Sequence, residues 1–324
     1  MLKRITLAIL ATVAGLTGAG FGYLYFRDPE IAPPAPVKVK ITAQRIERGK
    51  HLFEHVADCD GCHSERDWTR FGGPVVTAGR GKGNIFPGSL GFPGTVVAPN
   101  ITPDEETGIG AWTDGEKIRA IREGISRDGS ALFPFMPYQR FRHMSDEDVY
   151  SIVAYLNTLR PVRSALSRTR LDFPVSMLIR SAPKPAGQVA VPDPGDKLQY
   201  GKYLVNLAGC ITCHTPEQKG EMIAGREFAG GNVFRFPTAT VVSSNISPDC
   251  ETGIGRWTEQ DFVEKVYQYR DYALNGSPEV GPEGFTIMPW LMFSHMSPDE
   301  LGAIYTYLKT QKPIYNAVET HPAQ

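Results

Sequence analysis

The pentapeptide Cys-x-x-Cys-His occurs twice in this chain of 324 residues, at positions 59–63 and 210–214. Its spacing is the attachment signature of c-type haem, in which the two thiols form thioethers with the vinyl groups of the porphyrin. The adjacent histidine then lies beneath the iron as its proximal ligand. The sequence therefore predicts two covalently bound haem c groups. The predicted attachment residues are Cys59, Cys62, Cys210 and Cys213, and the predicted proximal ligands are His63 and His214.

The two haem motifs belong to a longer internal repeat. Residues 100–113 read Asn-Ile-Thr-Pro-Asp-Glu-Glu-Thr-Gly-Ile-Gly-Ala-Trp-Thr, and residues 245–258 repeat this pattern with an offset of 145. A Met-Pro pair at 136–137 and a His-Met-Ser triplet at 143–145 recur with an offset of 152. The change of offset indicates compensating length differences in loops, so the sequence predicts a tandem duplication of one module.

Each module is predicted to begin and end with a helix. Apolar residues recur at helical spacing before each haem motif, over residues 46–56 and 200–207. At the far end, Ser145 and Ser297 are predicted N-caps, each followed three residues later by an acidic residue that completes a capping box. Between these helices the chain is rich in Gly and Pro, most of all over residues 71–99. The predicted fold class is mainly α with long irregular loops.

The N-terminus carries an export signal of one of two kinds. Lys3 and Arg4 precede an uncharged run over residues 5–26 that ends in an aromatic cluster. As a helix this run is about 33 Å long, enough to cross a hydrocarbon core of about 30 Å. We expect a retained transmembrane anchor with its basic end in the cytoplasm. A cleaved signal peptide, with its cleavage site near residues 17–19, is the competing interpretation. Both place the haem modules in the periplasm.

The sixth iron ligand is predicted to be a methionine in each module. Met136 and Met288 each precede a proline within an aromatic stretch, so an extended loop can carry the thioether towards the iron. Met144 and Met296 are the alternatives. Each directly precedes an N-cap serine, where packing on the following helix as a hydrophobic staple explains it without a ligand role. The prediction is therefore Met136 and Met288 as distal ligands.

Several histidines are alternative candidates for an iron ligand. His143 and His295 also repeat, so bis-histidine ligation is an alternative, although a surface or propionate contact explains them equally well. His51 and His55 precede only the first motif, and we expect them to be solvated helix residues without a ligand role.

Two further features have open interpretations. The repeated Trp112 and Trp257 either fill core volume or donate an indole N–H to a haem propionate. Cys250 lies outside both motifs. The simplest expectation for it is a small packed residue, with a reactive or intermolecular thiol as the alternative.

The motifs quoted above resemble those of the cytochrome c subunits of bacterial membrane-bound dehydrogenases that oxidise alcohols, gluconate, sorbitol and aldehydes. The resemblance covers about residues 42–316. It implies two class I cytochrome c domains whose terminal helices cross around Gly49 and Gly201, with the Met-Pro methionines as axial ligands. It also implies electron transfer from a dehydrogenase subunit to quinone, another cytochrome or a terminal oxidase. The alcohol and gluconate subunits typically carry three haem motifs, whereas this chain has two.

The predicted division of the chain follows from the motifs. It comprises a membrane anchor or signal peptide (1–27), a Pro-rich tether (28–41), a first cytochrome c domain (42–162), a linker (163–196), a second cytochrome c domain (197–316) and a tail (317–324).

The expected function is electron transfer without a substrate site. A dihaem enzyme, such as a peroxidase or a thiosulfate dehydrogenase, is the alternative and requires one iron that is open or differently ligated. Both modules offer the same Met-Pro candidate, which argues against that asymmetry. A haem sensor would need a labile site and an output domain. The formal net charge of −1 gives no indication of a nucleic-acid partner.

Overall fold

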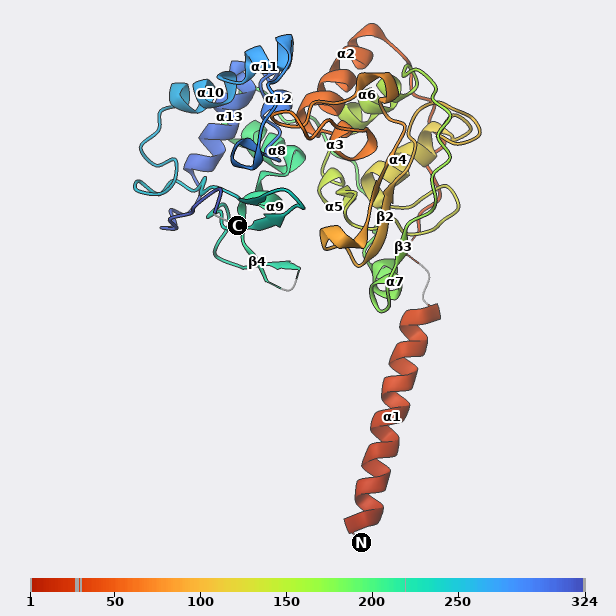
Figure 1. The fold of residues 1–324 in the computed structure, drawn as a ribbon. Helices are drawn as coiled ribbons and strands as arrows, with labels where there is room; N and C mark the ends of the chain where they lie inside the picture. The colour runs from red at the N-terminus through yellow and green to blue at the C-terminus, as the bar shows by residue number, and fades with distance from the viewer. Residues whose placement is uncertain (1, 27–28, 30, 219, 323–324) are drawn as a thin grey trace.

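The computed structural model describes residues 2–26, 29, 31–218 and 220–322. Two helical halves lie side by side, and the helix α1 (Leu2–Phe26) projects away from them with the N-terminus at its far end (Figure 1). The C-terminus lies on the second half. The predicted mainly helical fold class is confirmed, with short strands at the edges of each half.

The elements follow the predicted order. The first half contains α2 (Ala43–His51), the π-helical turn η1 (Leu52–Val56), α3 (Asp60–His63), η2 (Thr77–Gly79), β1 (Asn84–Phe86), η3 (Gly88–Leu90), β2 (Gly94–Ala98), α4 (Asp114–Glu123), α5 (Tyr138–Phe141) and α6 (Asp146–Leu156). The connecting segment contains β3 (Arg170–Leu171), α7 (Val175–Leu178) and η4 (Ile179–Ser181). The second half contains α8 (Lys197–Ala208), α9 (Cys210–His214), β4 (Glu217–Gln218), β5 (Glu221–Met222), β6 (Val233–Arg235), β7 (Thr240–Val242), α10 (Glu259–Tyr267), α11 (Arg270–Asn275), η5 (Pro282–Gly284), α12 (Trp290–Phe293) and α13 (Pro298–Lys309).

In each half the first and last helices cross at a glycine. The pairs are α2 with α6 and α8 with α13. A Cβ on Gly49 would lie 1.9 Å from the carbonyl oxygen of Ser151, and one on Gly201 would lie 1.8 Å from that of Ala303. These helices therefore touch backbone to backbone, and only glycine permits that approach.

The repeated Asn-Ile-Thr/Ser-Pro-Asp loops are structurally equivalent. Asn100 Nδ2 donates to the carbonyl oxygen of Val162 at 2.8 Å, and Asn245 Nδ2 donates to that of Ile314, also at 2.8 Å. Each asparagine thus ties its loop to the chain just after the last helix of its own half. Because these amides are buried, the bonds satisfy polar groups that would otherwise destabilise the fold.

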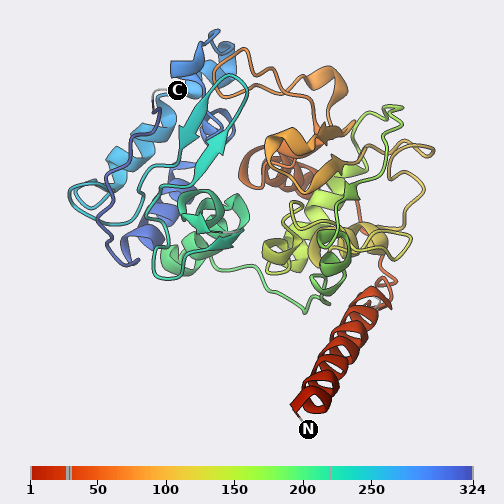
Figure 2. The same ribbon diagram turned by 60° about the horizontal axis from the view of Figure 1, so that its bottom comes forward.

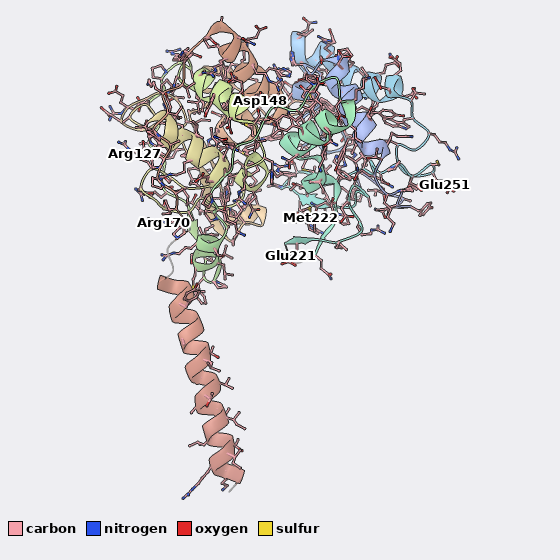
Figure 3. All side chains as sticks on the ribbon, turned by 180° about the vertical axis from the view of Figure 1, so that it is seen from behind. Arg127, Asp148, Arg170, Glu221, Met222 and Glu251 are labelled. Atoms are coloured by element: carbon pink, nitrogen blue, oxygen red, sulfur yellow. The ribbon has the colours of Figure 1, made fainter. Side chains whose placement is uncertain are left out.

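The two halves meet through an interface with approximate two-fold symmetry. His51 Nε2 lies 2.9 Å from Glu300 Oε1, and Tyr203 Oη donates to Asp148 Oδ2 at 2.6 Å. His51 and Tyr203 are 152 residues apart, as are Asp148 and Glu300. Equivalent positions therefore face each other, as in an isologous dimer interface. Figure 3 shows Asp148 on the side of the first half that faces the second.

His51 and His55 were predicted to be solvated, and this prediction is wrong. Besides the contact of His51 with Glu300, the ring of His55 stacks on that of His295 with centroids 4.4 Å apart. Burial, reinforced by the neighbouring His295, lowers the pKa of His55 to about 3, so this ring is neutral. The periodicity of one helix could not reveal that a second half covers these side chains.

The interface also alters one predicted capping box. Ser297 and Glu300 form a complete box at the start of α13. At α6, Ser145 caps the helix through its hydroxyl, but its backbone N–H donates to Tyr203 Oη at 3.1 Å. The predicted box at Ser145 is therefore incomplete, because a tyrosine of the other half takes the place of the acidic side chain.

A loop of the first half, residues 65–76, forms backbone hydrogen bonds with the second half (Figure 2). The N–H of Phe71 donates to the carbonyl oxygen of Pro278 at 2.9 Å, and the N–H of Val280 donates to that of Thr69 at 3.0 Å. These backbone bonds join the halves at a second place, away from the helices.

The segments around the halves depart from their predicted roles. In the described part of the chain no helix is long and apolar enough to cross a membrane, so the predicted transmembrane anchor is not supported. The helix α1 includes four glycines and three threonines, which lower its mean hydropathy. Residues 27, 28 and 30, where the anchor and tether were predicted to meet, and residues 323–324 of the predicted tail lie outside the described residues.

The predicted tether and linker both pack on the first half. Val39 is buried, and its backbone N–H donates to Asp114 Oδ2 at 2.9 Å, so the tether is not a free spacer at this point. In the linker, β3 pairs antiparallel with β2, with Leu171 opposite Gly94. The exact domain boundaries stay a prediction.

Replacing Gly201 tests the helix crossing. In Gly201→Ala the new Cβ cannot fit against α13, and we expect a loss of about 3 kcal/mol or more in the free energy of unfolding. Gly187→Ala is the matched control, since nothing lies within 4 Å of its added Cβ. Chemical denaturation measures both, and equal stabilities would contradict the backbone contact.

The pH dependence of stability tests the interface. Burial alone would raise the pKa of Glu300, but its hydrogen bond and charge interaction with His51 lower that pKa to about 2. The interaction therefore stabilises the folded protein above about pH 4.5 and is lost as the pH falls towards 2. Glu300→Gln keeps the helix cap and should lose about 1–3 kcal/mol near pH 6. In thermal melts the difference from the unmodified protein should vanish as the pH approaches 2; a difference independent of pH would contradict this role.

Candidate functional site

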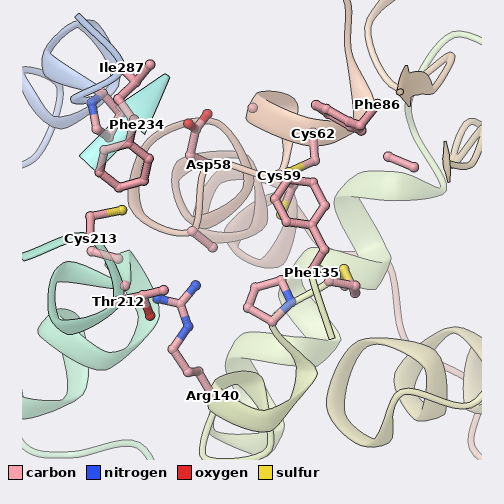
Figure 4. Close-up of a pocket in the computed structure, with 18 of the residues that line it drawn as sticks. Asp58, Cys59, Cys62, Phe86, Phe135, Arg140, Thr212, Cys213, Phe234 and Ile287 are labelled. Carbon is pink, nitrogen blue, oxygen red and sulfur yellow. The ribbon is translucent and has the colours of Figure 1, made fainter. Parts of the chain in front are cut away.

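The four motif cysteines line one cavity. Cys59 and Cys62, and likewise Cys210 and Cys213, are three residues apart on short helical segments, which brings each pair of sulfurs to one helix face. The cavity has a volume of about 2460 Å³ and extends through both halves. Small-molecule sites typically occupy about 300–1,000 Å³, so this cavity is large enough for more than one bulky cofactor. Figure 4 shows the region where the two motifs approach each other.

Burial raises the pKa of Cys62 and of Cys210 to about 12, and it also raises that of Cys59. Two cysteines three residues apart, followed directly by a histidine, are the arrangement that covalent attachment of a porphyrin requires. The donor set therefore fits covalent attachment of a porphyrin.

The two histidines have the same environment. His63 Nδ1 lies 2.8 Å from the carbonyl oxygen of Pro99, and His214 Nδ1 lies 2.7 Å from that of Ser244. A carbonyl only accepts, so Nδ1 carries the proton and Nε2 is left with a free lone pair for a metal. Burial lowers the pKa of both histidines, which keeps them neutral. Both rings thus have the tautomer that a proximal iron ligand needs.

The carbonyls of Pro99 and Ser244 were not anticipated from the sequence. Each belongs to the residue directly before the repeated asparagine, at an offset of 145. Their equivalent places in the repeat could have indicated a shared role. The acceptor is a backbone carbonyl, however, so the identity of the side chain does not reveal it.

Met136 and Met288 also line the cavity. Both are partly buried, whereas Met144 and Met296 are 0% and 1% exposed within the hydrophobic core and do not belong to the described cavity lining. The placement thus brings each Met-Pro methionine to the same cavity as a motif histidine. It leaves Met144 and Met296 as packing residues.

The Met-Pro segments are tighter than the predicted extended loops. The N–H of Tyr138 donates to the carbonyl oxygen of Met136 at 2.8 Å, and the N–H of Trp290 donates to that of Met288 at 2.7 Å. Each proline is then the N-cap residue of a four-residue helix, α5 or α12. The thioether is presented by a turn, which restricts its position more than an extended strand would.

The remaining candidate residues lie outside the cavity or are still compatible with more than one role. His143 is exposed and His295 stacks on His55, and neither lines the cavity in the described structure. Trp112 and Trp257 line it while packing on the core, so both of their predicted roles remain compatible with the geometry. Cys250 is exposed in a turn, which corrects the expectation of a packed residue.

Three charged residues of the cavity could not be predicted from the sequence. Asp58 directly precedes Cys59 and forms an ion pair with Arg66, with Arg66 Nη1 to Asp58 Oδ2 at 3.2 Å. Burial, partly offset by Arg66, raises the pKa of Asp58 to about 6. Arg140, on α5, points towards Thr212 and Cys213 of the other half (Figure 4). Nothing in the spacing of the sequence indicated that Arg140 meets the second motif.

Comparison with known proteins agrees with this geometry. The cytochrome c family profile matches residues 46–160. A dihaem c-type cytochrome of Cereibacter sphaeroides is 30% identical over 312 residues, which cover 93% of this chain and 95% of that protein. The chain belongs to the c-type cytochrome family. This cytochrome therefore binds haem c covalently and functions in electron transfer.

Other relatives are larger proteins. The cytochrome is 28% identical to the cytochrome c subunit of alcohol dehydrogenase (quinone) from Gluconobacter oxydans, over 94% of this chain and 60% of that one. It is 31% identical to the cytochrome subunit of fructose dehydrogenase from Gluconobacter japonicus, over 86% of this chain and 55% of that one. The cytochrome thus spans less than two thirds of either relative. The resemblance to dehydrogenase cytochrome c subunits is confirmed.

Replacing the methionines tests the distal ligands. In the purified oxidised protein, Met136→Ala and Met288→Ala should each abolish about half of the weak near-red methionine–iron absorption band, because each removes one of two thioether ligands. Met144→Leu and Met296→Leu are the matched controls, since they conserve core volume. Loss of the band in either control would show that the assignment is wrong.

Proposed function

We propose that this cytochrome is a two-haem electron carrier. His63 and Met136 would ligate one iron, and His214 and Met288 the other. The observation that carries the proposal is the equivalence of the two donor sets: in each half a histidine bonded to a backbone carbonyl and a methionine from a Met-Pro turn line the same cavity. Two such sites support two cytochrome c domains, over residues 42–162 and 197–316.

The residues of the chain have three tasks in this function. The haem group supplies one-electron chemistry, and the thioethers to the cysteines hold it in place. The carbonyls of Pro99 and Ser244 orient the proximal imidazoles and raise their basicity. Aromatic side chains such as Phe86 and Phe135, with ring centroids 5.0 Å apart, line the cavity and would give the iron an apolar environment, which favours its reduced state.

Ligation by both a histidine and a methionine would leave no position on either iron for peroxide or oxygen. This equivalence favours an electron-transfer function over that of a dihaem peroxidase or thiosulfate dehydrogenase, because such an enzyme needs one iron whose ligands differ. We therefore propose that the cytochrome has no substrate site of its own.

We propose a dehydrogenase subunit as the electron donor and quinone, another cytochrome or a terminal oxidase as the acceptor. The support is the identity of the relatives, which include the cytochrome c subunits of alcohol dehydrogenase (quinone) and of gluconate 2-dehydrogenase from Pantoea cypripedii, the latter 30% identical over 82% of this chain. The periplasm is the proposed location, because c-type haem is attached there in bacteria.

A haem count with spectroscopy tests the function. The purified protein should contain two haem c groups per chain, both low-spin and unreactive towards cyanide and peroxide. The double variant Cys59→Ala with Cys62→Ala should keep one haem, whereas Cys250→Ser, which changes an exposed cysteine outside both motifs, should keep two. A single haem in the unmodified protein would refute the two-haem proposal. A high-spin haem that turns over peroxide would instead support the dihaem enzyme.

A further inference from the structure

The two haem motifs face each other through equivalent positions that carry different residues. The residue before the first cysteine is Asp58 in one half and Gly209 in the other. Both have positive φ values, 45° and 74°, so the backbone is the same there. The third residue of the short helix after the Met-Pro turn is Arg140 in the first half and Met292, 152 residues later, in the second.

Beside the second motif, this arrangement places the guanidinium of Arg140. Arg140 Nη1 lies 1.6 Å from the point that a Cβ on Gly209 would occupy, so the glycine makes room for the guanidinium. Nη1 is buried and has no hydrogen-bond partner. Among the described residues no carboxylate is within ion-pair distance of Arg140. The backbone of Arg140 is held by Asn206, whose Nδ2 donates to its carbonyl oxygen at 3.0 Å.

Beside the first motif, the charges are paired. Met292 occupies the position equivalent to Arg140, with its Sδ 3.5 Å from Arg66 Nη2. The same guanidinium forms the ion pair with Asp58. The cation and the anion therefore largely cancel at the edge of this motif.

The first motif also has additional carboxylates nearby. Arg80 forms ion pairs with Asp60 at 2.9 Å and with Glu54 at 2.6 Å, and both carboxylates are buried. Around the first motif, three carboxylates thus face the two guanidiniums of Arg66 and Arg80. The position equivalent to Asp60 in the second motif is Ile211, which carries no charge.

We propose that Arg140 is a redox-tuning residue that sets the reduction potential of the haem at the second motif above that of the haem at the first. This inference rests on the proposed two-haem function. Reduction adds one negative charge at the iron, and an unpaired cation in a buried site of low dielectric favours that state. At the first motif the carboxylates outnumber the guanidiniums, and this negative charge disfavours the reduced state of the iron there.

The consequence is a direction for the electron. One electron would pass from a ferrous iron held at residues 59–63, which would become ferric, to a ferric iron held at residues 210–214, which would become ferrous, with no proton or bond change. The reduced dehydrogenase partner resupplies the first iron, and the oxidised acceptor removes the electron from the second. The order runs from residues 59–63 to residues 210–214.

The cost of leaving the buried Nη1 of Arg140 without a partner supports a role beyond packing. An unpaired buried charge is destabilising, and the second half shows that a methionine fits the equivalent position. Arg140 is therefore not required by the shape of the fold.

Redox titration of the purified two-haem protein, followed by optical spectroscopy, tests the proposal. The unmodified protein should show two separate potentials. Arg140→Met introduces the residue of the equivalent position. It should lower the higher potential more than the lower one, shifting the electron distribution between the irons roughly tenfold towards the first, or about 59 mV for one electron. Arg140→Lys keeps the charge and should retain most of the separation. Arg140→Gln provides a second neutral variant if the methionine disturbs folding.

The assignment of each potential to a motif comes from Met136→Ala and Met288→Ala, each of which perturbs one iron. Asp58→Asn should have the reciprocal effect and raise the lower potential. Unchanged potentials in both neutral variants, or a shift confined to the haem at the first motif, would overturn the role of Arg140. Failure of the two-haem function is separately visible as one haem or a high-spin haem in the unmodified protein.

Discussion

The backbone contact between two helices in each half is the constraint on which the other features depend. The four motif cysteines line a cavity of about 2460 Å³ that extends through both halves. Gly49 and Gly201 let α2 reach α6 and let α8 reach α13 with no side chain between them. Each haem motif follows the first of these helices in the chain, and each Met-Pro turn precedes the last.

The two halves share a geometry but differ in chemistry where they meet. His51 and Tyr203 occupy equivalent positions, and each contacts the acidic residue in the first turn of the other half's last helix. Closer to the motifs, an equivalent position carries either Arg140 or Met292. Two halves with equivalent ligands would hold two similar haems, and the facing residues are what can make them unequal.

The sequence predicted the chemistry of the site well and its surroundings poorly. The cysteines and histidines of the motifs were predictable because three-residue spacing on a helical turn brings both sulfurs to one face. The structure brings Met136 and Met288 to the same cavity. His51, His55 and Arg140 could not be predicted, because their partners lie in the other half. The packing of Val39 on Asp114 was missed for a related reason, since the two residues are 75 positions apart in the chain.

The sequence by itself determined the family and the covalent haem attachment, since these depend on residue types at short, regular spacing. The tertiary structure alone decided which side chains of one half meet the motif of the other. Positions far apart in the chain, such as 140 and 209, come together only through packing of the two halves. Local periodicity contains no information about that packing, and the electrostatic difference between the two motifs arises from it.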